Sequence, residues 1–308
     1  MNEPLVSVVI PCYNHDRYVQ ECIQSIIDQT YCNLELIIID DGSSDQSVVM
    51  IDQISTKCND RFVRFDFRHR PNKGLCATLN EALEWCQGEF VSPIASDDVM
   101  LPHKIRKQVS SFSSPLIAGV FGNVAVLQEG VIKNPVQSAE LAKPVVETVY
   151  SFRDIFFRKS KLPAPTAMLR RSDLIEVGGY DEDIAIEDFY LWLKLTESGK
   201  QLVHIGETLA LYRRHPGNQS QNSEIMLDGV LQILSRYDDR KDFPEALARS
   251  LLVHAGDLAG DGAGDSFRYL VRGLRQCPSL LFSKLFFVYF YRYGLGLRFS
   301  GKRNGHED

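Results

Sequence analysis

Pairs of neighbouring carboxylates stand at two places in the first hundred residues of this 308-residue chain. Asp97 and Asp98 follow the apolar run 89–95. Such a pair can hold a divalent cation, because Mg²⁺ and Mn²⁺ prefer oxygen ligands and often share them with substrate phosphates. The same pair also suits a turn followed by a helix N-cap, where aspartate is favoured for local reasons. Taken alone, the two residues leave both interpretations open.

The other pair, Asp40 and Asp41, ends the apolar run 34–39 and is followed by a glycine. A carboxylate at this point can accept hydrogen bonds from a base imide or from ribose hydroxyls, and glycine lets the backbone turn. Tyr13, just after Pro11, can lie flat against a nucleobase. A strand-to-helix turn, and packing of the tyrosine at a strand end, explain the same residues without a ligand.

Two further polar clusters lie in the second half of the chain. Glu187 and Asp188 precede an aromatic segment, where a carboxylate can act as a general base with a shifted pKa. Acidic residues at a helix start are also favoured by the helix dipole alone. In the cluster Arg213, Arg214 and His215, arginine suits a diphosphate and the imidazole can complete a metal shell. A solvated surface loop would contain the same residues.

The sequence lacks the signatures of several other protein classes. No GxGxxG follows the first apolar run and GxxxxGK[ST] does not occur, which argues against dinucleotide oxidoreductases and P-loop kinases. A net charge of -6 and a pI near 5.7 do not indicate a polyanion binder, so nucleic acid is not an expected partner. The seven cysteines form no CxxC pair and no zinc spacing, which favours reduced thiols in the cytosol.

The elements that would position these clusters alternate between strands and helices. Continuous or alternating apolar runs predict strands at 5–11, 34–39, 61–67 and 89–95, with helices between them. This alternation predicts an α/β fold with a mostly parallel central sheet flanked by helices on both faces. In such sheets ligands bind beyond the carboxyl ends of the strands, where both aspartate pairs would lie.

Capping residues and spacing predict where several other elements begin. We expect Asn14 or Asp16 to cap the first helix and Asp45 to cap the second. A strand is expected over 116–127, and 256–264 is expected to form a turn between two helices. From about residue 224 strand patterns disappear and helical spacing takes over.

Five stretches, in this order, make the chain resemble the large family of inverting glycosyltransferases with the GT-A fold, often called family 2. They are VSVVIPCYNHDRYVQECIQSIIDQTYCNLELIIIDDGSSD, NKGLCATLNEAL, SDDVMLPHK, TAMLRRSDLIEVGGYDEDIAIEDFYLWLKL and YRRHPGNQS. The resemblance implies a Rossmann-like GT-A sheet. It also implies transfer of a sugar from a nucleoside-diphosphate sugar, with UDP favoured, to a hydroxyl of a glycan.

The resemblance assigns roles to residues that match the family's motifs. It implies that the nucleotide is bound by Pro11, Tyr13, Asp40, Asp41 and Asp97. It implies that Asp98 and His215 bind Mn²⁺ or Mg²⁺ and that Asp188 is catalytic. Contacts near the diphosphate are implied for Arg213, Arg214 and Glu187. Many relatives have an aspartate where this chain has Ala95. This departure leaves open which of Asp97 and Asp98 binds the metal.

The implied mechanism is a single displacement. Asp188 would remove the proton from the acceptor hydroxyl, and that oxygen would attack the anomeric carbon from the face opposite the nucleoside diphosphate. The metal would neutralise the charge that grows on the leaving group. A metal-dependent nucleotidyltransferase and a non-catalytic nucleotide-sugar-binding protein are the alternatives. The first would need a basic loop after the first strand, where CYNHDRYV has only Arg17, and the second would not need Asp98 and Asp188.

The resemblance also implies an organisation. Residues 1–100 are expected to bind the nucleotide sugar and 101–225 the acceptor, as two halves of one GT-A domain, and 226–308 to form a C-terminal helical appendage. The expected acceptor is a glycan, free or linked to a polyprenyl diphosphate, in the synthesis of a bacterial surface polysaccharide such as O-antigen.

The segment 266–303 reverses the acidic charge of the chain, because it contains arginine and lysine but no acidic residue. Many leucine, phenylalanine and tyrosine residues lie between the basic ones, and Lys284 and Arg292 interrupt the apolar run, so it is too short and too charged to span a membrane. This composition is typical of an interfacial helix. We therefore expect a cytoplasmic enzyme attached peripherally to the inner, anionic face of the cell membrane. Packing onto the catalytic domain, or a homodimer interface, explains the same composition.

Overall fold

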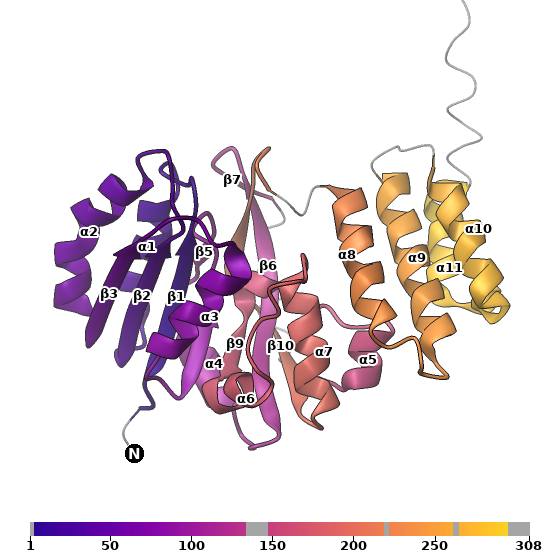
Figure 1. Cartoon of the computed structure of the whole chain (residues 1–308), viewed down its shortest axis with the longest axis horizontal. Coiled ribbons are helices and arrows are strands. Elements are labelled where there is room, and N and C mark those ends of the chain that lie inside the picture. Colours follow the sequence, from indigo (N-terminus) through magenta and orange to yellow (C-terminus); the bar gives the residue numbers. More distant parts are fainter. Residues whose placement is uncertain (1–2, 134–146, 219–221, 261–264, 295–308) are drawn as a thin grey trace, which may run out of the picture. The chain divides into compact units, whose positions relative to one another are not determined.

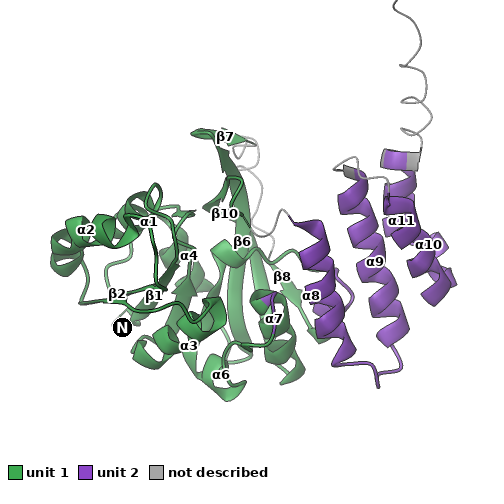
Figure 2. Cartoon of the chain, turned by 45° about the horizontal axis from the view of Figure 1, so that its top comes forward, with its two compact units in different colours: residues 1–152, 160–183, 187–218 green, residues 153–159, 184–186, 219–308 purple. Residues whose placement is uncertain are grey.

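The computed structural model describes residues 3–133, 147–218, 222–260 and 265–294. The chain divides into two compact units, which Figure 2 shows in different colours. Unit 1 consists of Met1–Phe152, Ser160–Asp183 and Glu187–Asn218, and unit 2 of Arg153–Lys159, Ile184–Ile186 and Gln219–Asp308.

Unit 1 is built on one mixed sheet, in which the described residues form ten strands in the order β3-β2-β1-β4-β9-β6-β10-β5, with β7 beside β6 and β8 beside β10 (Figure 1). The strands are β1 (Val6–Cys12), β2 (Leu34–Asp40), β3 (Arg64–His69), β4 (Phe90–Pro93), β5 (Val99–Met100), β6 (Ile117–Gln128), β7 (Val131–Lys133), β8 (Thr148–Tyr150), β9 (Met168–Arg170) and β10 (Gln201–Arg214). β1 to β4 pair in parallel, as do β6 and β10. β5, β7, β8 and β9 pair antiparallel, which the sequence analysis did not predict.

Helices cover both faces of the parallel part of the sheet, which confirms the predicted α/β class. The helical segments that precede β10 are α1 (Val19–Ile27), α2 (Ser47–Arg61), α3 (Leu75–Trp85), α4 (Lys104–Ser111), α5 (Phe152–Phe156), η1 (Ala164–Thr166), α6 (Arg171–Glu176) and α7 (Glu187–Glu197). Of these, α5 belongs to unit 2 from Arg153 onward. Alternate residues of β1, beginning with Val6, pack against the apolar faces of α1 and α2, while α3 also contacts β1 and β2. A strand covered on both faces has to be apolar along its length, and every residue of β2 is buried.

The loops after β1 and β2 are joined to each other by side-chain hydrogen bonds. Asn14 and Asp16 do not cap α1, so that prediction is wrong. Asn14 Oδ1 instead accepts a hydrogen bond from the backbone N–H of Ser44 at 2.8 Å. Asp45 accepts one from the N–H of Asp16 at 3.0 Å and one from the N–H of Ser47, the first residue of α2, at 2.9 Å. These bonds fix the carboxyl-terminal ends of the two strands as one surface.

Unit 2 is helical in its described residues, as the spacing from about residue 224 predicts. Its elements after the sheet are α8 (Ser223–Ser235), α9 (Phe243–Gly260), α10 (Ser266–Gln276), the 3₁₀ segment η3 (Pro278–Phe282), α11 (Lys284–Tyr289) and the π-helical turn η4 (Phe290–Gly294). The turn expected over 256–264 begins later than predicted, because α9 continues to Gly260, and residues 261–264 lie outside the described part. Of the helices that the structure describes, none combines the length and apolar character needed to cross a membrane.

Close packing of α9 against α10 depends on Gly273. A Cβ atom at this position would lie 2.5 Å from Leu252 Cδ1 and 2.9 Å from the carbonyl oxygen of Ala248. Leu252 and Ala248 belong to a small core that also contains Leu270 and Tyr289. Unit 2 therefore has an apolar core of its own between α9, α10 and α11.

Candidate functional site

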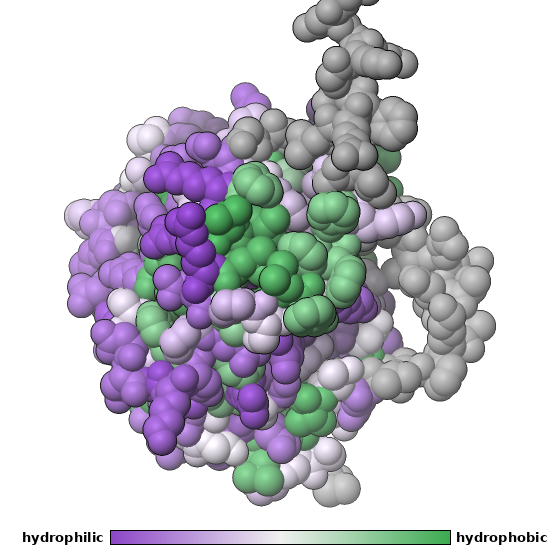
Figure 3. Space-filling view, turned by 90° about the vertical axis from the view of Figure 1, so that its right-hand side faces the viewer, coloured by the Kyte–Doolittle hydropathy of each residue, from purple (hydrophilic) through white to green (hydrophobic). Residues whose placement is uncertain are grey.

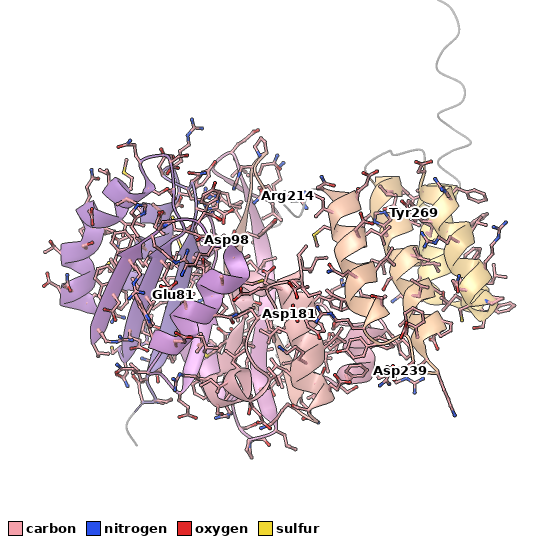
Figure 4. All side chains as sticks on the ribbon, in the orientation of Figure 1. Glu81, Asp98, Asp181, Arg214, Asp239 and Tyr269 are labelled. Carbon is pink, nitrogen blue, oxygen red and sulfur yellow. The ribbon has the colours of Figure 1, made fainter. Side chains whose placement is uncertain are left out.

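The carboxyl ends of the parallel strands carry the two aspartate pairs. Asp40 is the last residue of β2, and the backbone N–H of Asp41 donates to the carbonyl oxygen of Cys12, the last residue of β1, at 2.8 Å. Asp97 and Asp98 lie in the turn between β4 and β5. Figure 4 shows Asp98 beyond the upper ends of these strands. The alternation of strands and helices correctly predicts which edge of the sheet these side chains share.

Asp97 faces two histidines from distant parts of the chain. Its Oδ2 lies 2.9 Å from His215 Nε2 and accepts a hydrogen bond from Asn218 Nδ2 at 3.2 Å, while its Oδ1 lies 4.0 Å from His15 Nδ1. His15, Asp97 and His215 each offer one ligand atom, and these atoms all lie within 4.8 Å of one another. Two imidazoles and a carboxylate are a suitable donor set for a first-row divalent metal ion.

Asp98, the next residue, is not one of these three ligand groups. It is 2% exposed, and its Oδ1 accepts a hydrogen bond from the backbone N–H of Arg213 at 2.8 Å. Burial and the adjacent charge of Asp97 raise the pKa of the Asp98 carboxyl well above its usual range. Two neighbouring carboxylates in such surroundings favour a positive ion between or beside them. The assignment of the metal to Asp98 stays a prediction, and the structure adds Asp97 as a carboxylate that faces imidazoles.

Strand β10 brings the basic cluster to the aspartates, because Leu211 of β10 pairs with Val99, the residue after Asp98. Arg213 Nε donates to the carbonyl oxygen of Asp97 at 2.7 Å, and its guanidinium also contacts Glu21. Arg213 therefore supports the turn that carries Asp97 and Asp98. Arg214 is exposed at the end of β10 and is labelled in Figure 4, and its contact with a diphosphate stays a prediction.

The Asp40 and Asp41 carboxylates are hydrogen-bonded by the protein itself. The fully buried Asp40 accepts from the N–H of Ser43 at 2.9 Å and lies 2.8 Å from His69 Nδ1. Asp41 pairs with the Arg70 guanidinium and accepts from two backbone N–H groups that lead into α3, those of Lys73 at 2.8 Å and Gly74 at 2.9 Å.

These contacts give the first aspartate pair a positioning role, and direct contact of Asp40 or Asp41 with a nucleoside stays a prediction. The expected nucleoside contacts also include Pro11, which pairs with Ile39 inside the sheet, and Tyr13, which follows β1. Tyr13 is 50% exposed, so its ring is accessible for stacking on a base. Tyr13 thus presents an exposed aromatic ring just after the end of β1.

Glu187 and Asp188 occupy the first turn of α7. Burial and the adjacent charge of Asp188 raise the pKa of Glu187. Burial, followed by the charge of Glu187, also raises the pKa of Cys76 to about 12, which places the start of α3 beside the acidic pair. A carboxylate pair in such surroundings takes up a proton more readily than an exposed acid, as a general base must.

The sequence analysis missed three residues that complete the site. His15 and Asn218 approach the Asp97 carboxylate, and Tyr18 stacks on the His215 ring with centroids 5.0 Å apart. The loop CYNHDRYV was examined for basic charge and for caps, so its histidine and second tyrosine were not considered as site residues. A histidine two residues after Tyr13, at the end of a strand, was the available signal.

Comparisons with known proteins agree with this architecture. The model of the family "Glycosyl transferase family 2" matches residues 7–178. An uncharacterized glycosyltransferase of Haemophilus influenzae is 38% identical over 125 residues, a match that covers 41% of this chain and 49% of that protein. The chain thus spans about half the length of that relative.

Two further relatives match over longer stretches. Glycosyltransferase GlyG of Streptococcus pneumoniae serotype 4 is 28% identical over 233 residues, which cover 70% of this chain and 72% of GlyG. The Escherichia coli protein WfgD, a UDP-Glc:alpha-D-GlcNAc-diphosphoundecaprenol beta-1,3-glucosyltransferase, is 26% identical over 223 residues, which cover 72% of this chain and 82% of WfgD.

Solved structures show the same fold. S. aureus TarS 1-349 in complex with UDP-GlcNAc has a TM-score of 0.60 at 18% identity, covering 88% of this chain and 79% of that chain. Mannosyltransferase PcManGT from Pyrobaculum calidifontis, in complex with GDP-Man and Mn²⁺, has a TM-score of 0.61 at 16% identity, covering 96% of this chain and 87% of that chain. Because the family model matches more than half of its 308 residues, the chain belongs to glycosyl transferase family 2.

Proposed function

We propose that this glycosyltransferase is metal-dependent and inverting, and that it transfers a sugar from a nucleoside-diphosphate sugar, most simply UDP-linked, to a glycan hydroxyl. The observation that carries the proposal is the group of His15, Asp97 and His215 beside Asp98, at the strand ends where ligands bind in such sheets. UDP is favoured because the TarS structure contains UDP-GlcNAc and the name of WfgD specifies UDP-Glc. The division of the GT-A domain into a donor half, 1–100, and an acceptor half, 101–225, is part of the proposal.

Asp97, Asp98 and His215 are the residues we propose to hold Mn²⁺ or Mg²⁺. The donor set fits such an ion, because two carboxylates are adjacent in the turn after β4 and an imidazole contacts one of them. When bound, the ion supplies positive charge that stabilises the departing diphosphate. The exposed Arg214 adds a cationic side chain at the end of β10.

Asp188 is the proposed general base. It accepts the proton of the acceptor hydroxyl while that oxygen attacks the anomeric carbon, and the displacement inverts the configuration. Glu187 stands next to it in the first turn of α7, and the two carboxylates repel each other when both are ionised. This repulsion favours uptake of a proton by the pair, which is what the reaction requires of a base.

The acceptor we propose is a glycan on a polyprenyl diphosphate, in bacterial surface polysaccharide synthesis such as that of O-antigen. The name of WfgD specifies a GlcNAc-diphosphoundecaprenol acceptor, and the matched region covers 82% of WfgD. The direct test offers UDP-, GDP- and dTDP-sugars to the full chain with Mn²⁺ and a synthetic polyprenyl-diphosphate sugar, with and without a chelator.

The expected outcome of this test is a transferred sugar of inverted anomeric configuration, observed by NMR, and no product with the chelator. Retention of configuration would contradict the displacement, and full activity with the chelator would contradict the metal. Diphosphate release from a nucleoside triphosphate and a sugar phosphate would indicate the nucleotidyltransferase alternative. Tight donor binding without turnover would indicate a binding protein.

We also propose that unit 2 attaches the enzyme to the inner face of the cell membrane. Figure 3 shows apolar side chains gathered on the surface of this unit. Phe282 is 84% exposed and Tyr291 77% exposed, although both are large and apolar. The exposed apolar residues of α10, η3, α11 and η4 are Phe267, Leu281, Phe282, Phe287, Val288, Phe290 and Tyr291. A cluster of this kind on a soluble surface usually meets a partner or a membrane.

The charge of this unit supports an anionic membrane rather than an apolar protein partner. Arg268, Arg272, Arg275 and Lys284 are all exposed in the same unit, and the segment 266–294 contains no acidic residue. Each basic residue near an anionic surface contributes about 1 kcal/mol, and inserted aromatic rings add to this. Of the other basic residues of the predicted tail, those at positions 298, 302 and 303 lie outside the described residues.

A flotation experiment tests this surface with the full-length chain. Phe282→Asp and Phe287→Asp place charge on the apolar cluster, and Val63→Asp is the matched control, because Val63 is 62% exposed in unit 1. We expect the wild type and the control to float with anionic vesicles at low salt. The two unit 2 variants should remain unbound at the bottom of the gradient. Equal flotation of all variants, or no flotation of wild type, would contradict the proposal. A lower mass of the Phe variants in light scattering would indicate a homodimer surface instead.

A further inference from the structure

The loop between β1 and α1 is held in place residue by residue. The backbone N–H of Asn14 donates to Ser43 Oγ at 2.8 Å, and that of His15 donates to Ser47 Oγ at 2.9 Å. The next N–H, that of Asp16, donates to the Asp45 carboxylate. Asn14 has a positive φ of 55°, a conformation that needs support from its surroundings. Side chains of the loop after β2 therefore fix the position of His15.

The His15 side chain is directed at the carboxylate cluster. Its Nδ1 lies 2.7 Å from Ser96 Oγ and 4.0 Å from Asp97 Oδ1. Its ring stands edge to face against the His215 ring, with centroids 5.6 Å apart and an interplanar angle of 87°. The side chain is 24% exposed, so the imidazole lies at the border between the site and solvent. A ligand that binds beside Asp97 therefore meets two imidazoles. One, His15, lies near the beginning of unit 1, and the other, His215, lies near its end.

We propose that His15 is a direct ligand of the divalent metal, together with Asp97 and His215, and that it makes the site prefer Mn²⁺ over Mg²⁺. This inference rests on the proposed metal-dependent function. The preference follows from the donor set, because nitrogen ligands suit first-row transition metals, whereas Mg²⁺ is usually held by oxygen and water. Replacing a water ligand with an imidazole therefore favours Mn²⁺ selectively.

The distances fit one ion with small side-chain movements. Nitrogen and oxygen ligands of such metals lie about 2.0–2.2 Å from the ion, so two ligands on opposite sides are about 4.3 Å apart. The three ligand atoms here lie within 4.8 Å of one another, so rotations that shift them by a few tenths of an ångström suffice. The bond of 2.9 Å between His215 and Asp97 would open as the ion takes its place.

Two substitutions separate a metal ligand from a hydrogen-bonding residue. His15→Asn places an amide near the position of Nδ1, so it can still bond to Ser96 but offers no imidazole. Ser96→Ala removes the hydrogen bond and keeps the imidazole. His103→Gln is the control, because His103 Nε2 bonds to the carbonyl oxygen of Thr208, outside the candidate ligand group.

The experiment measures metal binding by the full chain with electron paramagnetic resonance of Mn²⁺, with and without UDP, and with Mg²⁺ as competitor. Pulsed spectra detect couplings to imidazole nitrogen. We expect two imidazole nitrogens in wild type, Ser96→Ala and His103→Gln, and one in His15→Asn. His15→Asn should weaken Mn²⁺ binding about 10- to 100-fold, and Mg²⁺ binding by no more than about threefold.

The outcomes distinguish this inference from the function on which it rests. Wild-type protein that binds Mn²⁺ through one imidazole, or a His15→Asn variant with an unchanged Mn²⁺ to Mg²⁺ preference, would overturn the role of His15 and leave a metal-dependent transferase intact. Wild-type protein that binds neither ion, even with UDP, would overturn the metal-dependent function itself. Loss of Mn²⁺ binding in Ser96→Ala, equal to that in His15→Asn, would assign His15 a hydrogen-bonding role only.

Discussion

Two pairs of neighbouring aspartates, Asp40 with Asp41 and Asp97 with Asp98, lie at the carboxyl edge of the same sheet. The groups that surround the two pairs differ sharply. Asp40 and Asp41 accept hydrogen bonds from side chains and backbone N–H groups, and Asp41 is paired with the Arg70 guanidinium. Asp98 receives one backbone N–H, and burial together with the neighbouring charge of Asp97 raises its pKa. The protein itself pairs both carboxylates of the first pair, whereas in the second pair Asp97 meets His215 and Asn218 and Asp98 has one backbone donor.

This difference separates the residues that build the site from those available for chemistry. A buried carboxylate that is fully hydrogen-bonded stabilises a loop but has little capacity left for a ligand. A carboxylate next to another negative charge is destabilised when both are ionised. It therefore binds a cation or a proton more readily. We therefore expect substitution in the first aspartate pair to reduce stability, and substitution in the second pair to reduce activity.

Asp98→Ala should have the largest effect on activity. Loss of a metal-binding carboxylate should reduce metal-dependent turnover by about three orders of magnitude or more. The melting temperature should stay the same or rise, because the substitution also removes the repulsion from Asp97. Both quantities are measured on one preparation, by donor turnover and by thermal unfolding. A folded variant with normal turnover would show that Asp98 is no part of the metal site.

Asp188→Asn tests the third acidic pair. Asparagine keeps the size and removes the base, so turnover should fall about 10²- to 10⁴-fold while donor affinity remains. Donor affinity is measured by calorimetry and turnover under single-turnover conditions. Because burial and the charge of Asp188 raise the pKa of Glu187, the substitution should also lower the pKa of Glu187. A variant that loses donor affinity but turns over bound donor normally would identify Asp188 as a binding residue.

Asp41→Asn should have the opposite profile to Asp98→Ala. The substitution leaves the Arg70 guanidinium, which is 9% exposed, without one of its two carboxylate partners. We expect the free energy of unfolding to fall by roughly 2–4 kcal/mol, which chemical denaturation at pH 7 would measure. Turnover per folded molecule, assayed well below the new melting temperature, should fall much less than in Asp98→Ala. Unchanged stability with abolished turnover would reverse the distinction between the two pairs.

Lys104→Met extends the comparison to a buried positive charge. Burial lowers the pKa of Lys104 to about 7, and its amine donates to Ser92 Oγ at 2.6 Å and to the carbonyl oxygen of Ala167 at 3.2 Å. The folded state therefore binds fewer protons than the unfolded state between about pH 7 and pH 10, so wild-type stability should rise with pH across this window. Methionine removes the titration.

The advantage of Lys104→Met should be greatest at pH 7 or below, at roughly 2–4 kcal/mol, and should shrink as the pH approaches 10. Urea unfolding of both proteins at three pH values in this range measures it. A difference in stability that does not vary with pH would show that the amine keeps its charge in the folded protein.

Local patterns predicted the elements of the first hundred residues well. The runs at 5–11 and 34–39 became β1 and β2 within one residue at each end, because a strand buried on both faces must be apolar throughout. The third strand was displaced, from 61–67 to Arg64–His69, because β3 lies at the end of the sheet and is only partly buried. The short antiparallel strands β5, β7 and β8 were missed, since they owe their place to partner strands rather than to a pattern of their own.

By itself the sequence determined the α/β class, the edge of the sheet that carries the polar clusters and the family, because these depend on local periodicity and on motif order. Only the tertiary structure decided what each carboxylate does. Asp41 meets an arginine that is 29 residues away in the sequence, and Asp97 meets a histidine that is 118 residues away. Charge compensation inside a protein depends on which groups the fold brings within a few ångströms, and no local pattern records that distance.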